Sequence, residues 1–172
     1  GYIANLLGLR KDLPFLDVQA GCTGFNFAFS VAEMFIKAGQ YRTVAVIGTD
    51  KLSAITDYQD RNTCVLFGDG AGALILKQST SEGIIRSHLG GNARLRDLLI
   101  LSKKDGTGNG YIWMEGRKVY TFAKRAMVDS CFRVLDPSGT AGKKELRALF
   151  EQVTKIIPHQ ANARIIMGAA EE

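Results

Sequence analysis

The sequence predicts an α/β protein, and two observations support this fold class. First, the apolar runs at 15–20 and 43–48 are typical of short strands covered on both faces. Second, apolar residues between these runs, over 25–36, recur with helical i, i+3, i+4 spacing, and Gly39 follows as a stop signal. A strand, a helix and a strand at this spacing form a βαβ unit, so we expect parallel strands.

The composition excludes several other classes of protein. The apolar and charged fractions, 46% and 23%, are ordinary for a globular chain. No apolar run is long enough to cross a bilayer and no signal pattern opens the chain, so we expect a cytoplasmic protein. The three cysteines, Cys22, Cys64 and Cys131, are too widely spaced for a disulfide framework or a zinc site. A net charge of +5 without a lysine–arginine run suits an acidic or phosphate-bearing partner better than nucleic acid.

Cys22 stands at the junction between the first predicted strand and the helix that follows it. A cysteine there lies among the unpaired N–H groups of the first turn, at the positive end of the helix dipole. Both effects favour the thiolate, so we expect the pKa of Cys22 to fall and its sulfur to be a nucleophile. The alternative is a small buried cysteine that packs as an apolar residue.

A glycine-rich run over 68–72 has two interpretations. Its Gly-x-Gly-x-Gly spacing resembles part of a dinucleotide-binding loop, which requires a helix after the glycines. Residues 73–76 instead continue as an apolar strand, so we expect a strand whose glycines permit a bulge or a close backbone approach.

The remaining elements follow from the same rules of periodicity and punctuation. We expect the end of a helix at 1–10, short strands at 83–89, 111–114 and 154–158, helices at 119–134 and 143–152, and a helix beginning within 160–166.

His159 comes directly after the strand expected at 154–158, where Pro158 interrupts strand pairing. It therefore occupies a place equivalent to that of Cys22, at a strand end before a helix, where open α/β sheets bind their ligands. A thiolate and an imidazole there could activate a nucleophile or stabilise an oxyanion. The alternative is a histidine that caps a neighbouring turn. His88 has no such setting, and we expect it to be an ordinary surface residue.

Three motifs in this order and spacing resemble those of the β-ketoacyl-acyl-carrier-protein synthase III family, the condensing enzymes that start bacterial fatty-acid synthesis. They occupy residues 17–25, then 60–63 with 67–72, and 158–166. The resemblance implies a thiolase-like α/β fold, in which two similar halves stack as αβαβα layers, present here only in part. It places 1–85 in the first half, 86–115 in a connecting segment and 116–172 in the second half.

The resemblance also implies roles for particular residues. Cys22 matches the nucleophile that accepts an acyl group from acyl-coenzyme A, and acetyl is the expected group. His159 matches the histidine that assists decarboxylation of malonyl-acyl-carrier protein and stabilises the resulting enolate. The products are a β-ketoacyl chain on the carrier protein, coenzyme A and carbon dioxide. No cofactor is implied, since coenzyme A enters as a thioester substrate.

Binding residues carry over in the same way. Residues that match the coenzyme A tunnel are Arg61, Asn62, Ala161 and Asn162. Residues that match the docking segment for the acidic carrier protein are Gln160, Ala161, Asn162, Ala163 and Arg164. The resemblance implies a homodimer, and no membrane, metal or nucleic acid is expected.

The chain also departs from the family pattern. The third catalytic residue of the family, an asparagine beyond the histidine, has no counterpart before Glu172, and Arg117 stands where the family commonly has asparagine. We therefore expect an internal fragment with apolar faces exposed, inactive in isolation.

Three other functions remain in competition. A related ketosynthase or acyltransferase of secondary metabolism would use the same cysteine on another acceptor. A non-catalytic partner subunit would retain the fold without needing Cys22 and His159. A cysteine protease is disfavoured, because the surrounding motifs do not match.

Overall fold

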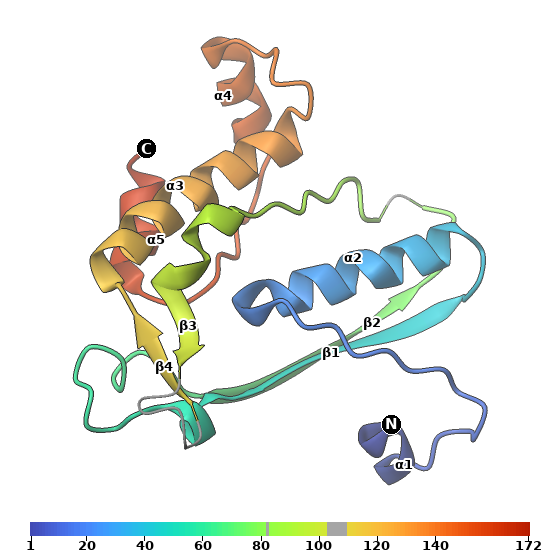
Figure 1. Ribbon diagram of the computed structural model, residues 1–172. Coiled ribbons are helices and arrows are strands. Elements are labelled where there is room, and N and C mark those ends of the chain that lie inside the picture. Colours follow the sequence, from blue (N-terminus) through green and yellow to red (C-terminus); the bar gives the residue numbers. More distant parts are fainter. Residues whose placement is uncertain (82, 103–109) are drawn as a thin grey trace.

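An antiparallel hairpin and a helix that runs along it form the first part of the structure. The structure is a computed structural model that describes residues 1–81, 83–102 and 110–172. The hairpin pairs β1 (Thr43–Lys51) with β2 (Asp69–Lys77) along their full lengths. The helix is α2 (Gly24–Lys37), which runs along one face of the hairpin (Figure 1). Gly39 follows it with a φ of 72°, a left-handed conformation that ends the helix as expected.

Alternation along β1 explains why α2 packs against this face. Val46 is 3% exposed, and Val44 and Gly48 share its side of the strand. Ala32 of α2 is also 3% exposed. At Gly48, a Cβ atom would lie 3.0 Å from the Phe25 ring, so the absence of a side chain lets the start of α2 approach the strand closely.

The second part of the structure joins a short strand pair to three helices. β3 (Leu99–Ser102) pairs antiparallel with β4 (Tyr111–Met114), and α3 (Gly116–Leu135), α4 (Lys143–Glu151) and α5 (Ala163–Ala170) follow. The rings of Phe132 in α3 and Phe150 in α4 lie 5.4 Å apart, edge to face. Lys124 of α3 forms an ion pair with Glu172, just beyond α5.

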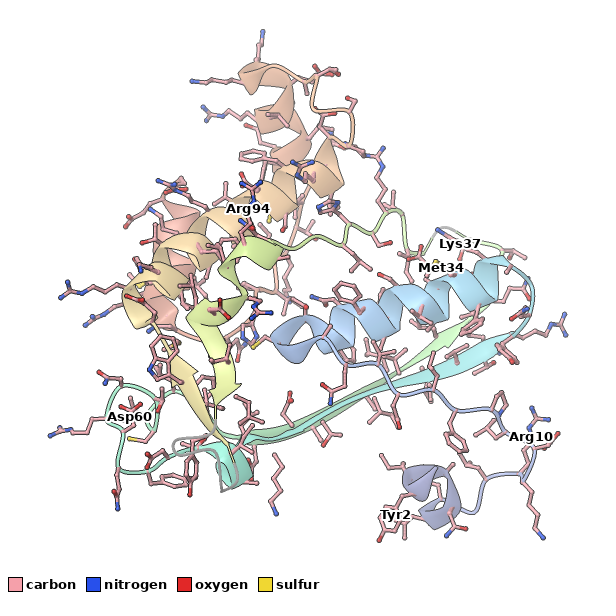
Figure 2. The ribbon with its side chains drawn as sticks, viewed as in Figure 1. Tyr2, Arg10, Met34, Lys37, Asp60 and Arg94 are labelled. Atoms are coloured by element: carbon pink, nitrogen blue, oxygen red, sulfur yellow. The ribbon has the colours of Figure 1, made fainter. Side chains whose placement is uncertain are left out.

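Four short helical pieces complete the described chain: α1 (Tyr2–Leu6) and the 3-10 turns η1 (Gly21–Thr23), η2 (Leu52–Ile55) and η3 (Ala93–Leu98). Helix α1 lies apart from α3, α4 and α5, below the hairpin in Figure 1. Figure 2 shows Met34 and Lys37 at the far end of α2. Lys37 pairs there with Glu33, a buried carboxylate one helical turn earlier.

Several expected elements are confirmed. The strand after the glycine run is β2, so the glycines belong to a strand and not to a nucleotide-binding loop. The helices expected at 119–134 and 143–152 are α3 and α4, and the strand expected at 111–114 is β4. A helix begins within 160–166, at Ala163.

The expected βαβ unit is wrong. Residues 15–20 form no strand, and the partner of β1 is β2 in antiparallel register. Phe15 and Leu16 are exposed, and a strand requires a neighbour for its backbone N–H and C=O groups, which this segment does not have in the described structure.

The strands expected at 83–89 and 154–158 are wrong for the same reason. Both segments are extended or irregular, and Ile157 is 81% exposed. The expected connecting segment 86–115 contains η3, β3 and β4, while its residues 103–109 lie outside the described residues.

The face of the hairpin opposite α2 is apolar and uncovered. Ile75 is 74% exposed there, beside Ala45 and Ala73 and near Ile47. This observation confirms the expectation of exposed apolar faces, which ordinarily mark surfaces that other protein covers. Among the described helices, none is long and apolar enough to cross a membrane.

Candidate functional site

Cys22 lies in the 3-10 turn η1, which leads directly into α2. Gly21 before it has a φ of 53°, so the chain enters the turn through a left-handed residue. Both the backbone N–H and the hydroxyl of Thr23 donate to the Ala20 carbonyl, at 3.2 and 2.9 Å. The expected position at the beginning of a helix is therefore confirmed, although no strand precedes it.

The electrostatic expectation for Cys22 is wrong. Its side chain is exposed, but the protein around the sulfur removes water from the thiolate, and this desolvation raises the pKa of the thiol. The Asp50 carboxylate raises it further, while the Cys22 backbone N–H acts in the opposite direction. The resting form favoured by these groups is the neutral thiol.

Asp50 lies near Cys22 because of the register of β1. It shares the strand face of Val46 and Gly48, the face that α2 covers. Gly48 contacts Phe25, only three residues after Cys22. Two residues beyond Gly48, Asp50 therefore lies on the side of the strand that faces the first turn of α2.

His159 is exposed in the irregular segment between α4 and α5. Three residues later, the Asn162 side chain caps α5 by accepting a hydrogen bond from the Arg164 N–H at 2.8 Å. The Tyr120 hydroxyl donates to the Arg164 carbonyl at 3.4 Å and so links α3 to α5. The start of α5 is thus well anchored, whereas His159 precedes the anchor and follows no strand.

Arg61 and Asn62 lie in the loop between η2 and β2, which Asp60 organises (Figure 2). The Asp60 carboxylate accepts the Asn62 N–H, the Asn62 amide and the Thr63 hydroxyl, each at 3.0 Å. These bonds hold the pKa of Asp60 below its ordinary value, and Thr63 is 0% exposed. The loop therefore has a defined shape, from which Arg61 extends as an exposed side chain.

In the described structure, not all the expected site residues contact one another. It records no hydrogen bond or ion pair between Cys22 and His159 across residues 1–81, 83–102 and 110–172. It does bring Asn162, Ala163 and Arg164 together at the start of α5, after Gln160 and Ala161. No cluster of three histidine, cysteine or acidic side chains suited to a metal occurs among the described residues.

Sequence reasoning missed three aspartates that shape the site. Asp69 accepts the Ser53 N–H at 2.8 Å and the Ser53 hydroxyl at 2.6 Å, which joins η2 to the start of β2 and lowers the pKa of Asp69. Asp60 could have been found, because an aspartate two residues before a polar residue is typical of a turn. Asp50 and Asp69 gave no such local signal, since their partners are distant in sequence.

Known proteins resemble this chain along most of its length. A sequence model of the 3-oxoacyl-[acyl-carrier-protein] synthase III family matches residues 16–93. A curated synthase III from Clostridium acetobutylicum is 42% identical over 171 residues, which cover 94% of this chain and 50% of that protein. The chain therefore spans about half the length of the curated relatives it matches.

Solved structures also resemble this chain, again over about half of their own length. The synthase III of Aquifex aeolicus has a TM-score of 0.84 at 38% identity, over 99% of this chain and 51% of that one. The priming β-ketosynthase of a polyketide biosynthetic pathway has a TM-score of 0.85 at 29% identity, over 99% of this chain and 50% of that one.

We predict that Asp50→Asn makes Cys22 more reactive near neutral pH. The carboxylate disfavours the thiolate, so its removal lowers the pKa of the thiol and enlarges the thiolate fraction at any pH below that pKa. Iodoacetamide alkylation of Cys22, followed by mass spectrometry between pH 6 and 10, should be about twofold faster at pH 7 and low salt. The exposed acid Asp129, on α3, supplies the control Asp129→Asn. Superimposable rate profiles for the two variants would contradict the effect of the Asp50 carboxylate on the pKa of Cys22.

Proposed function

Because this chain belongs to the β-ketoacyl-acyl-carrier-protein synthase III family, we propose that it carries the nucleophile of an initiating condensing enzyme. The thiolase-like α/β fold expected from the sequence is confirmed in part, over about half of the related structures. The observation that carries the proposal is the place of Cys22, in the turn that opens α2 and inside the segment that the family model matches.

In the proposed first half-reaction, the Cys22 sulfur attacks the carbonyl carbon of acyl-coenzyme A, with acetyl as the expected acyl group. The new C–S bond replaces the bond to coenzyme A, which leaves as a thiol with the proton that Cys22 loses. A thiol whose pKa is raised rests as S–H, so proton loss accompanies the attack. The Cys22 backbone N–H is a donor for the oxyanion that forms.

In the proposed second half-reaction, His159 acts on the malonyl group carried by acyl carrier protein. Loss of carbon dioxide leaves an enolate, whose thioester oxygen the imidazole stabilises by hydrogen bonding. The carbanion then attacks the acyl carbon on Cys22, a C–C bond forms, and the Cys22 thiolate departs. The product is a β-ketoacyl group on the carrier protein.

The binding roles also remain proposals. Arg61 is exposed on a rigid loop, which suits stacking against the coenzyme A adenine, and Asn62 is oriented by Asp60. The Asn162 side-chain oxygen caps α5, which leaves its amide N–H groups for a ligand. Beside them stands Ala161, the fourth residue proposed for coenzyme A.

Docking of the acidic carrier protein is proposed for residues 160–164. Arg164 is exposed at the start of α5, and the positive net charge of the chain complements an acidic partner. For the complete protein we also propose a homodimer in the cytoplasm, with 1–85 in one half of the fold and 116–172 in the other.

A ketosynthase of secondary metabolism is the second candidate, and one observation favours it. The priming β-ketosynthase of a polyketide pathway superposes on this chain as closely as the synthase III of Aquifex aeolicus does. Its lower identity, 29% against 38%, ranks it second. The choice of acyl acceptor separates the two, and it is measured by offering malonyl-acyl-carrier protein against free acids or amines.

We predict that the full-length protein gains one acetyl group on Cys22 when it is incubated with acetyl-coenzyme A, and that Cys22→Ser gains none. A serine hydroxyl is a far weaker nucleophile than a thiol at neutral pH. Intact-protein mass spectrometry measures the adduct. Cys131→Ser is the matched control, since Cys131 is a half-buried residue of α3. An adduct that survives in Cys22→Ser would overturn the assignment.

His159→Ala should separate the two half-reactions. We expect normal acetylation of Cys22 but a loss of about a hundredfold in β-ketoacyl formation, because the imidazole acts only on the malonyl group. Radiolabelled malonyl-acyl-carrier protein and the acetylated enzyme give the second rate directly. Equal loss of both rates would contradict a role confined to condensation.

Arg164→Glu tests the docking segment. We expect the KM for malonyl-acyl-carrier protein to rise about tenfold, since the change opposes an acidic partner, while acetylation by acetyl-coenzyme A stays unchanged. Arg147→Glu makes the same charge change at an exposed site on α4. Similar KM values for both variants would exclude residues 160–164 as the docking segment.

A further inference from the structure

The segment before η3 passes the C-terminal end of α3 (Figure 1). A small hollow lies between them. Its volume is about 220 Å³, and its lining consists of Arg86, Ser87, His88, Arg133 and Pro137. It is formed apart from the segments of Cys22 and His159, and neither the sequence motifs nor the proposed reaction involves it.

The Arg86 side chain is anchored in this hollow. Its Nη1 donates to the carbonyls of Val134 and Leu135, at 3.3 and 2.9 Å. The last carbonyls of a helix have no partner within the helix, so these bonds satisfy acceptors that would otherwise present negative partial charge. A guanidinium has five N–H donors, and three remain for a ligand.

Basic and donor groups dominate the lining. Arg133 and His88 accompany Arg86, and the Ser87 hydroxyl adds a neutral donor, while none of the described residues that line the hollow is acidic. The adjacent acid in sequence is Asp136, whose carboxylate accepts bonds from the Ser138 hydroxyl and the Ala141 N–H in its own turn. Asp136 is not among the residues that line the hollow, and these bonds hold its carboxylate within its own turn.

The His88 side chain lies near the backbone two residues after it. A Cβ added at Gly90 would lie 3.2 Å from the His88 Nε2. Arg86 and His88 line the hollow from one segment, and Arg133 lines it from a helix more than forty residues later in the chain.

We propose that this hollow binds a phosphate group. Guanidinium groups bind phosphate oxygens through paired, charge-assisted hydrogen bonds, and a histidine and a hydroxyl add further donors in a lining that contains two arginines. Both free phosphate and the terminal phosphate of a small organic phosphomonoester carry this chemistry. The inference does not depend on the proposed function.

The test is calorimetric titration of the full-length protein with inorganic phosphate, and separately with glycerol 1-phosphate. We expect saturable binding that Arg133→Gln weakens about tenfold, the loss of one charge-assisted bond. Arg125→Gln removes the same charge from an exposed site on the same helix, and it should leave the affinity unchanged. Tighter binding of glycerol 1-phosphate than of phosphate would identify an organic ligand, and the reverse order would identify the free anion.

A second variant distinguishes loss of phosphate binding from misfolding. Ser87→Ala removes a donor but no charge, and it should weaken phosphate binding while the thermal unfolding midpoint is retained. Absence of saturable heat with both ligands would overturn the proposal. So would equal weakening by Arg133→Gln and Arg125→Gln, since that result would show only a general attraction of anions to a basic surface. Acetylation of Cys22 is measured separately, so its failure is distinguishable from failure here.

Discussion

The packing of α2 on the β1–β2 hairpin is the constraint on which the candidate site depends. Val46 and Ala32 bury the apolar side of this contact, and Gly48 lets the Phe25 ring reach the strand backbone. Since Phe25 follows Cys22 by three residues, the same contact determines where the sulfur lies. It also explains why Asp50, two residues beyond Gly48, influences the thiol.

Magnitudes explain why the Cys22 pKa rises although the residue opens a helix. A helix dipole at an exposed terminus contributes roughly 0.3–1 kcal/mol, and one pKa unit corresponds to about 1.4 kcal/mol. The dipole therefore lowers the pKa of a thiol by less than about one unit. Desolvation and a carboxylate both oppose it here, and together they prevail. A position at a helix start is thus insufficient evidence for a thiolate.

The sequence predicted those elements that local interactions determine. α3 and α4 were found because helical periodicity lies within one segment, and β2 because residues 73–76 continue the apolar run after the glycines. The strand expected at 15–20 was wrong, because a strand also needs a neighbour that no local pattern reveals. The Cys22 and His159 motifs were visible in sequence for the opposite reason: each is a short contiguous run, whereas Asp50 depends on the register of β1.

Different interactions position the two proposed catalytic residues, Cys22 and His159, and this difference bears on how the candidate site is assembled. The packed contact between α2 and β1 determines the position of Cys22. His159, by contrast, is exposed and precedes the Asn162 cap by three residues. Pro158 limits the backbone before His159, but Ile156 and Ile157 in the same segment are exposed. Apolar residues in an extended segment gain stability only when other groups cover them. Burial of these two isoleucines would fix the backbone beside His159, so the direction of its imidazole ring depends on the assembled fold and not on the local motif alone.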